Sequence, residues 1–519
     1  MRKQNMTIIK NQQIIFSMNS TKHLFRSIIA VFLISVTPTF AQQTLTLEEC
    51  REMALEQNKK IKMSQQDAQA AAYTKKSAAT HYLPKISFGG GYLRTNKSIK
   101  PLDQDLLLPI VPFNTIDPST GMFSPNALND PETALNTLVI DPNTGAPMTD
   151  AAGNPIFKNY AMLPADKLTL DNKNLYYARL SLSQPLFTGF KIVESNKMAR
   201  HAENIANKNV VLTKAEVLSK TDEAYWRVVS LNQKVKLAQS YEALLDQLVT
   251  DLENMYAEGI ITKNDVLKAQ VKQNESKLQV LKAENGLALS KMALAQIVGI
   301  DSGEYIDVMD KDIDDNEVLL SSSPINPEAS AENRAEISML KEKVSVMQAQ
   351  RNIERSKFMP SVLLTGGYGF ANPNPYNGLK NEFGGDWSVG VVVSMPIFTW
   401  GERKHDMNVA NMKKIRAQYE LDDAREMINL EIRQNQFKHI ESIKKVEMTK
   451  LSVLQAEENM NTTKDNLSEG RTTLSELLEA QLQWADASSE HIDALIEVKT
   501  TLTELEKSTG EIYKHINNN

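Results

Sequence analysis

Residues 258–270 read EGIITKNDVLKAQ, and residues 469–481 read EGRTTLSELLEAQ. The two stretches share Glu, Gly, Leu, Ala and Gln at matching positions, and an acid stands six positions after each glycine. Glycine commonly ends a helix, Thr or Asn caps the helix that follows, and an acid is favourable in the first turn of that helix. Each stretch therefore predicts the turn of a helical hairpin, at Gly259 in the first copy and at Gly470 in the second.

The two turns belong to a long internal repeat. Pro84 and Pro360, which precede the first strand of each copy, lie 276 positions apart, whereas the later landmarks lie 211 apart, so the first copy carries 65 extra residues in between. A repeat without gaps in its helical part predicts two hairpins of equal arm length, whose turns reach the same level. The pairs that lie 211 positions apart are Pro185/Pro396, Phe187/Phe398, Glu258/Glu469, Gly259/Gly470, Ala269/Ala480, Gln270/Gln481 and Gly299/Gly510.

The hairpin arms show the pattern of long coiled-coil helices. No proline occurs in residues 186–323 or after Pro396. A helix from about residue 191 to residue 256 would be roughly 100 Å long, because the rise is about 1.5 Å per residue. Apolar or small residues recur in it at every seventh position, which is typical of a coiled-coil seam. The seam residues are Val217, Ala224, Leu231, Ala238, Leu245 and Leu252.

Two alternating segments precede each long helix. In residues 86–93 aromatic side chains occupy one face and small residues the other, and residues 176–183, 362–370 and 387–394 alternate in a similar way. Alternation with a period of two predicts β-strands. Between the first two strands, residues 97–174 hold ten of the nineteen prolines and show no periodicity, which predicts a large irregular loop.

Four strands per chain constrain the architecture. Strands with one apolar face and one small or polar face are typical of outer-membrane barrels. Four strands cannot close a barrel, and an open sheet edge cannot lie in lipid, so the chain must oligomerise. Two copies would supply eight strands and three copies twelve, with long helices around a conduit; the alternative is a soluble sheet that caps a coiled coil. The aromatic residues that favour a membrane interface are Tyr82, Tyr92, Tyr176, Tyr368, Trp387 and Trp400.

The N-terminus carries an export signal. Basic residues precede an apolar stretch at residues 27–36, which predicts a signal peptide over residues 1–41 with cleavage after Ala41. Translation from Met18 is an alternative start, and an uncleaved anchor is the alternative interpretation of the segment. No run of 18 apolar residues follows, so no helical membrane span is expected in the mature chain.

Composition argues against several classes of function. The chain of 519 residues has a formal net charge of −6, which gives no signal for binding a polyanion. The sequence holds no histidines in metal-ligand spacing, no phosphate loop and no nucleophile elbow. Cys50 is the only cysteine, which rules out an intrachain disulfide, and a capping box of Thr46 and Glu49 beside it predicts a helix-packing residue. We expect no enzymatic activity, no cofactor, no metal and no nucleic-acid partner.

The chain resembles the TolC-like outer-membrane efflux proteins, the outer membrane factors of tripartite efflux and secretion systems, over essentially all of the mature sequence. The resemblance rests on LTLEE at residues 45–49, on Leu-Pro at 83–84 and Met-Pro at 359–360, on Pro-Leu-Phe at 185–187 and Pro-Ile-Phe at 396–398, and on the two glycine turns.

The resemblance implies a homotrimer with a twelve-stranded barrel in the outer membrane of a Gram-negative bacterium, continuous with a long periplasmic α-helical coiled-coil barrel. It also implies a passive exit duct that docks onto a periplasmic adaptor (a membrane fusion protein) and an inner-membrane pump of the RND or ABC type. The alternative is a secreted trimeric coiled-coil protein, structural or adhesive, without a pore.

The resemblance assigns roles to the hairpin tips. In the family, an acidic ring at the second turn narrows the periplasmic entrance; here it falls on Glu476 and Glu479, with Asp265 as the acid of the first turn. Glutamates replace the usual aspartates, and Arg471 lies one position from where the family often has a basic latch residue. The alternatives are a solvated charge pair at a helix start and turns with a purely structural role. The residues expected at the tips and in adaptor docking are Gly259, Thr262, Leu267, Ala269, Gly470, Arg471, Thr473, Leu478 and Ala480. The junction between barrel and helices is expected at Pro185, Phe187, Gly189, Pro396, Phe398 and Gly401.

The expected fold is a mixed α and β membrane protein with an internal tandem repeat. We expect a signal peptide (1–41), an N-terminal periplasmic helix (42–83), two strands (84–186) with a long extracellular loop (97–174), and the first hairpin (187–299). An equatorial linker (300–334), a helix (335–359), two further strands (360–397), the second hairpin (398–510) and a C-terminal tail (511–519) complete the chain.

Overall fold

The computed structural model describes residues 43–98, 100–169, 173–300, 306–310 and 327–517. The expected signal peptide and its cleavage point lie outside these ranges. The chain divides into two compact units. The helical unit comprises Met1–Lys75, Lys197–Gln350 and Val409–Asn519, and the sheet unit comprises Lys76–Asn196 and Arg351–Asn408.

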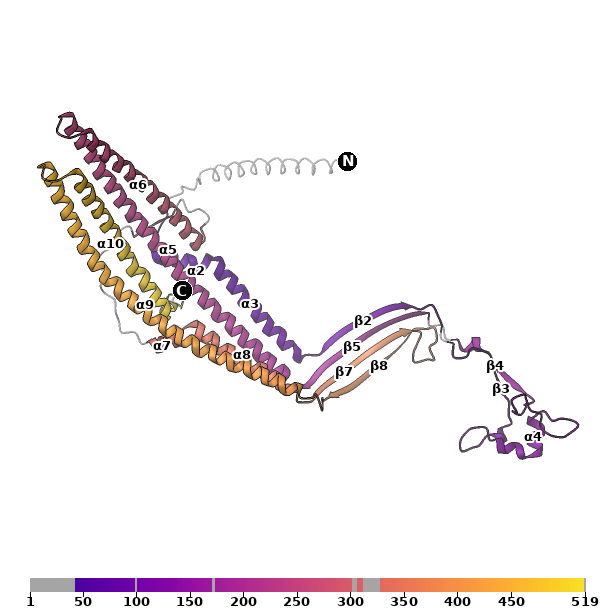
Figure 1. The fold of residues 1–519 in the computed structure, drawn as a ribbon. Helices are drawn as coiled ribbons and strands as arrows, with labels where there is room; N and C mark the ends of the chain where they lie inside the picture. The colour runs from indigo at the N-terminus through magenta and orange to yellow at the C-terminus, as the bar shows by residue number, and fades with distance from the viewer. Residues whose placement is uncertain (1–42, 99, 170–172, 301–305, 311–326, 518–519) are drawn as a thin grey trace, which may run out of the picture. The chain divides into compact units, whose positions relative to one another are not determined.

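Two long helical hairpins follow from the two halves of the repeat (Figure 1). The first consists of α5 (Lys191–Ala257) and α6 (Lys263–Val298), and the second of α9 (Glu402–Ser468) and α10 (Leu474–Thr509). The outgoing helices have 67 residues each and the returning helices 36 each. A gapless repeat of 211 positions therefore produces arms of equal length.

The N-terminal helical segment is interrupted, which corrects the expectation of one helix. α2 (Leu47–Gln57) and α3 (Lys59–Ala79) are separated by Asn58, and a short 3-10 helix follows at Thr80–Tyr82. The Asn58 side chain accepts a bond from the Lys60 amide at 2.9 Å and donates to the Ile297 carbonyl at 2.9 Å. Asn58 thus bonds one of the free amides at the start of α3 and links this point to the end of α6, while its extended backbone turns the chain.

The segment expected as an equatorial linker contains regular structure. β6 (Ile306–Val308) pairs in parallel with β1 (Gln43–Leu45), and α7 (Pro327–Glu332) precedes α8 (Ala335–Ser356). The buried side chains of Leu45, Ile306 and Val308 join a core cluster with Cys50. The structure confirms Cys50 as a buried packing residue, and burial raises the pKa of its thiol to about 12.

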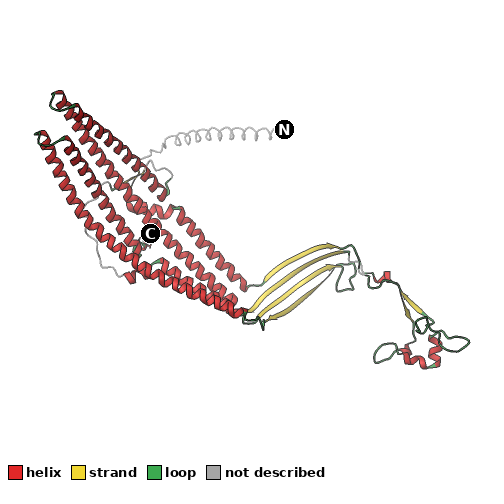
Figure 2. Cartoon of the chain, in the orientation of Figure 1, coloured by secondary structure: helices red, strands yellow, loops and turns green. Residues whose placement is uncertain are grey.

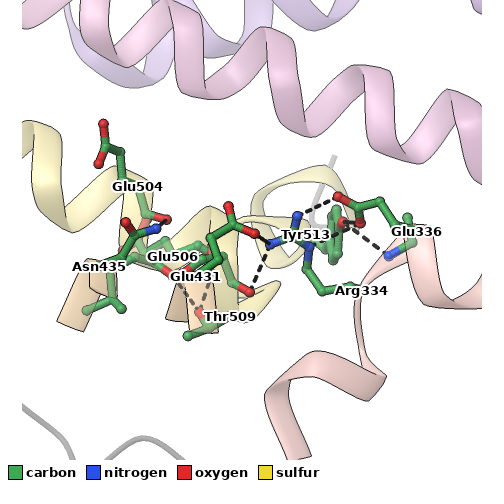
Figure 3. Close-up of polar contacts among 11 residues, drawn as sticks. Arg334, Glu336, Glu431, Asn435, Glu504, Glu506, Thr509 and Tyr513 are labelled. Atoms are coloured by element: carbon green, nitrogen blue, oxygen red, sulfur yellow. Dashed lines mark hydrogen bonds and ion pairs between the residues drawn. The ribbon is translucent and has the colours of Figure 1, made fainter. Parts of the chain in front are cut away.

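A buried arginine ties α8 to the C-terminal end of the chain (Figure 3). The Arg334 guanidinium pairs with Glu336, contacts Glu431 at 3.4 Å and donates to the Ser508 carbonyl at 3.0 Å. The Tyr513 hydroxyl accepts a bond from the Ala335 amide at 3.2 Å. The expected tail is therefore partly helical and packed, with α11 at Tyr513–Asn517.

The sheet unit holds a four-stranded antiparallel sheet in the order β2-β5-β7-β8, labelled in Figure 1 and drawn in yellow in Figure 2. Its strands are β2 (Lys85–Arg94), β5 (Asn174–Thr188), β7 (Ser361–Asn372) and β8 (Gly384–Ser394). β5 extends to Thr188, slightly beyond the boundary at residue 186 that the sequence predicted. It can contain Pro185, which has no amide proton to donate, because the strand has a bulge between Pro185 and Phe187.

The long insertion between β2 and β5 is more ordered than the predicted irregular loop. It contains the antiparallel pair β3 (Leu106–Pro109) and β4 (Tyr160–Leu163) and the helix α4 (Pro131–Thr137). Asp130 caps α4 by accepting bonds from the Thr133 amide and hydroxyl. Three 3-10 turns complete it, at Phe113–Thr115, Pro125–Asn129 and Ala165–Leu168.

Among the described residues, no helix is both long enough and apolar enough to cross a membrane.

Candidate functional site

Each hairpin tip is closed by a glycine in the left-handed region. Gly259 has a φ of 77° and Gly470 a φ of 68°. The amides of Gly259 and Ile260 donate to the carbonyls of Tyr256 (3.0 Å) and Met255 (2.9 Å). At the second tip, the amides of Gly470 and Arg471 donate to Leu467 (3.0 Å) and Asn466 (2.8 Å) in the same pattern. These paired hydrogen bonds satisfy the last carbonyls of α5 and α9. They require a residue that tolerates positive φ at the position of the glycine.

A capping box begins each returning helix. At the first tip, the Asp265 amide donates to the Thr262 hydroxyl at 3.4 Å and the Thr262 amide donates to the Asp265 carboxylate at 3.3 Å. At the second tip, the corresponding distances between Glu476 and Thr473 are 3.3 Å and 3.0 Å. The predicted threonine caps are therefore confirmed. Two of the three candidate entrance acids, Asp265 and Glu476, are already engaged in stabilising a helix start.

The acids of the two tips differ in their surroundings. The Thr472 hydroxyl, together with the Thr473 amide, lowers the pKa of Glu476 from its ordinary value. The Thr262 hydroxyl lowers the pKa of Asp265. Glu479 lies one turn further along α10 and is exposed, with a long contact of 3.4 Å from the Gln483 amide. Of the two candidate entrance acids at the second tip, Glu479 is thus the one whose carboxylate takes no part in the capping box.

Two residues expected to contact an adaptor are buried inside the chain. Ala269 is 0% exposed and Ala480 is 3% exposed. Ala269 joins a core cluster in which α5, α6 and α10 meet, together with Tyr241, Leu245 and Leu477. These two alanines therefore serve the packing of the hairpins and present no exposed surface to a partner, while the docking role of the tips stays a prediction. Leu267, at 49% exposed, and the half-buried Leu478 remain accessible at the tips.

The sheet separates an apolar face from a small and polar face. Cross-strand pairs such as Tyr92/Tyr176 and Tyr368/Trp387 place side chains of one kind on the same face. The apolar face carries Ile86, Phe88, Tyr92, Tyr176, Leu180, Leu182, Val362, Leu364, Tyr368, Phe370, Trp387, Val389, Val391 and Val393. The opposite face carries Lys85, Ser87, Gly89, Gly91, Arg179, Ser181, Ser183, Thr365, Gly367, Gly369, Asp386, Ser388, Gly390 and Ser394, with Leu93, Leu175, Tyr177, Leu363 and Val392 as apolar exceptions.

The expected junction residues lie where strands pass into long helices. Gly189 has a φ of 61°, and a Cβ there would lie 2.6 Å from the Ser356 carbonyl oxygen, so only glycine fits. Gly401 has a φ of 85°. The sequence reasoning missed the neighbours Phe190 and Trp400, which also adopt positive φ. The available sequence signal was their position, since Phe190 directly follows Gly189 and Trp400 directly precedes Gly401. In the structure their rings contact those of Phe187 and Phe398, at 5.4 Å and 4.8 Å between centroids.

The sequence reasoning also missed a buried ion pair in the helical unit. Asp222 is fully buried on α5 and accepts two bonds from the Arg51 guanidinium, at 2.8 Å and 2.6 Å. The Thr503 hydroxyl of α10 donates to the same carboxylate at 3.1 Å. This arrangement joins α2, α5 and α10. Because both carboxylate oxygens of Asp222 accept hydrogen bonds, we interpret the residue as structural. The described part of the chain holds no cluster of three or more His, Cys, Asp or Glu side chains placed to bind a metal ion.

A family model described as outer membrane efflux protein matches residues 146–300 and 326–511. The fold is similar to that of the outer membrane protein VceC from Vibrio cholerae (14% identity, 89% of this chain and 96% of that chain covered, TM-score 0.63). It is also similar to the Campylobacter jejuni CmeC outer membrane channel (16% identity, 91% of this chain and 88% of that chain covered, TM-score 0.64). A third similar structure is the open state of the Neisseria gonorrhoeae MtrE outer membrane channel (14% identity, 92% of this chain and 93% of that chain covered, TM-score 0.63). A search of curated protein sequences gave no significant match.

The structural likeness at these identities establishes the fold, whereas the family model covers more than half of the chain and establishes the family. Membership favours an efflux duct over a fibre without a pore. The amphipathic sheet, the paired hairpins and the match over both halves of the repeat lead to one conclusion: the chain belongs to the outer membrane efflux protein family, whose members are non-enzymatic channels.

Proposed function

We propose that three copies of the chain form a passive exit duct in the outer membrane of a Gram-negative bacterium. Their sheets close one twelve-stranded barrel, and their hairpins form a helical tunnel in the periplasm. The observation that carries this proposal is the four-stranded sheet. One of its faces is apolar, and its two edge strands, β2 and β8, each have a strand partner on one side only among the described residues.

The edges of the sheet require partners. β2 and β8 each pair with one strand among the described residues, so each presents a row of backbone groups on its outer side. Such groups cannot stay unpaired in lipid. β2 and β8 have ten and eleven residues, a length that suits a tilted membrane-spanning strand of about 9–11 residues. Pairing β8 of one copy with β2 of the next satisfies both edges and closes the barrel.

The helices also leave apolar stripes for neighbouring copies. Exposed apolar side chains follow each other on α6 and α9 at spacings of three, four, seven or eight residues, as on one face of a coiled-coil helix. Contiguous exposed apolar surface of this kind marks an interface. The stripe residues on α6 are Leu267, Val271, Leu278, Leu281, Leu289 and Met292. Those on α9 are Val409, Met412, Tyr419, Met427, Leu430, Phe437, Ile440, Met448, Leu451 and Leu454.

The second hairpin tip is the proposed periplasmic entrance. Three copies bring three Glu479 carboxylates and three capped Glu476 carboxylates around one axis, where they repel each other and attract cations. Asp265 takes a lesser part, because Lys268 lies 3.8 Å from its carboxylate and offsets its charge. The exposed Ile260, Leu267 and Arg471 are the proposed contacts for a periplasmic adaptor, which links the duct to an inner-membrane pump of an efflux or type I secretion system.

Purified protein in detergent tests the assembly, and planar lipid bilayers test the pore. We expect the mass of a trimer and stable single-channel conductance. The native Cys50 is buried and should not react, so cysteines introduced on β2 and β8 can be cross-linked without interference from it. Disulfides between a cysteine at Ser87 and cysteines scanned along β8 should join different copies. A monomer without conductance would contradict the proposed function.

A further inference from the structure

One row across the sheet holds two opposite charges on the small and polar face. The register pairs Gly89 of β2 with Arg179 of β5, Arg179 with Gly369 of β7, and Gly369 with Asp386 of β8. Arg179 and Asp386 therefore stand two strands apart in the same row, about 10 Å from each other at the usual strand spacing. Both side chains are exposed.

The neighbours of Arg179 leave its guanidinium uncovered. A Cβ added at Gly89 or Gly369, its two cross-strand partners, would meet no atom within 4 Å. A Cβ added at Gly367 would lie 3.8 Å from Arg179 Nε, which places the side chain over this glycine. Because both cross-strand partners are glycines, no neighbouring side chain in this row covers the guanidinium.

Neither charge is neutralised within the chain. No carboxylate pairs with Arg179 among the described residues, and the Asp386 carboxylate accepts a bond from the amide of its own neighbour Trp387 at 2.8 Å. The other charged residue on this face, Lys85, lies at the far end of β2 and pairs across the strand with Ser183. Ionisable residues in membrane-spanning strands are costly on the lipid side and are typically found facing a water-filled interior.

We propose that Arg179 and Asp386 form a charged band on the inner wall of the assembled barrel, which sorts permeating solutes by charge. Arg179 transiently binds the carboxylate or phosphate groups of permeating solutes, for which the guanidinium has matching hydrogen-bond donors. Asp386 acts in the same way on cationic groups. This inference rests on the proposed trimeric barrel, which would place three copies of each residue around one passage.

Reversal potentials in planar bilayers under a KCl gradient test the band. Arg179→Gln should lower the permeability of chloride relative to potassium by about twofold at 0.1 M salt, as expected for three charges roughly 10 Å from the axis. Asp386→Asn should raise this ratio by a similar factor. Both shifts should shrink at 1 M salt, because the screening length falls from about 10 Å to about 3 Å.

Matched variants separate charge from structure. Arg179→Lys keeps the charge and should retain the reversal potential of the unmodified channel. Arg94→Gln removes an equal charge from the last position of β2, on the opposite face beside Asn174, and should change nothing. The double variant Arg179→Gln/Asp386→Asn should return towards the original ratio. Repeating the series with Glu479→Gln prevents the proposed entrance ring from masking the effect.

The outcomes distinguish this inference from the proposed function. Trimers that conduct but keep the same reversal potential in Arg179→Gln and Asp386→Asn would overturn the charged band and leave the duct intact. Equal shifts in Arg94→Gln would also overturn it, because the location of the charge would then not matter. Unmodified trimers that fail to conduct would overturn the duct itself, and the band with it.

Discussion

The two hairpin tips share one backbone design but differ in the charges that they expose. Both use a glycine with positive φ followed by a threonine cap and an acid that completes the capping box. One turn later, the first tip has Lys268, which lies 3.8 Å from the Asp265 carboxylate, whereas the second tip has the exposed acid Glu479 at the matching position. After each glycine, the first tip exposes Ile260 and the second exposes Arg471.

This difference separates structure from function within the repeat. Residues that were kept in both copies make the turn, because the backbone has the same requirements at both tips. Some residues that differ are buried, such as Val266 and its counterpart Leu477, and these remain apolar. Lys268 and its counterpart Glu479 differ in charge, lie on the surface where the fold does not constrain them, and make the second tip more negative. This difference supports the proposal that the second tip forms the entrance and that the first tip braces it.

Substitution of the tip glycines should have the largest effect. Gly470→Val forces a β-branched residue into positive φ, at a cost of about 1–3 kcal/mol, although open space surrounds the position. We expect export of a fluorescent pump substrate to fall at least tenfold in cells that carry only this variant, with trimers still assembled. Gly259→Val is the matched control and should reduce export less. Equal losses in the two variants would contradict the assignment of the entrance to the second tip.

Exchange of the surface charges should have the next largest effect. Glu476→Ala combined with Glu479→Ala should weaken the preference for potassium over chloride about fivefold in planar bilayers and reduce block by divalent cations, because six carboxylates leave the narrow entrance. Glu479→Lys alone copies the charge of the first tip and should act in the same direction. Lys268→Glu, which copies the second tip, should raise cation preference slightly. Unchanged selectivity in the double alanine variant would rule out the acidic entrance ring.

Removal of the threonine caps should affect both tips to a similar extent. Thr262→Ala and Thr473→Ala each remove a capping bond worth about 1 kcal/mol, so amide exchange in the first turn of the following helix should accelerate about fivefold. Hydrogen exchange measured by mass spectrometry on peptides from each tip would show it. A much smaller change at the second tip would indicate that Thr472, which also binds Glu476, replaces the lost contact.

Acidification should have the smallest effect. The pKa values of Asp265 and Glu476 are lowered in the folded protein by hydroxyl and amide donors, so their contribution to stability is present at neutral pH and is lost as the pH falls below the ordinary carboxyl range of about 4. The rate of amide hydrogen exchange at both tips, corrected for the intrinsic rate, should rise modestly as the pH is lowered from 5 to 3. Glu476→Gln should remove this dependence at the second tip and leave the first tip unchanged.

The local features of the fold were readable from the sequence because each depends on a few adjacent residues. The turns at Gly259 and Gly470 and the threonine caps are of this kind, since positive φ and a free amide are requirements of the backbone itself. The separation of apolar from small residues on the strands followed from a period of two. The family resemblance added the entrance and docking roles, which no spacing of residues could supply.

Several features depended on partners far away in the chain and escaped prediction. The break at Asn58 is fixed by the Ile297 carbonyl, and β1 pairs with β6 more than 250 residues later. The C-terminal α11 is held through Tyr513 by the amide of Ala335. Such contacts join segments that are far apart in the sequence and carry no local signal of their own. Periodicity and capping rules use only neighbouring residues, so they cannot predict these contacts.

The sequence by itself determined the repeat, the equal hairpin arms and the two tips, because these follow from local backbone chemistry copied at a constant offset. Only the tertiary structure decided which residues of each tip remain available. Ala269 and Ala480 looked equivalent to Leu267 and Leu478, yet they are buried, and Glu476 is committed to its cap while Glu479 stays exposed. The reason is physical: the face that a helix buries depends on the helices packed against it, and those neighbours come from both halves of the chain.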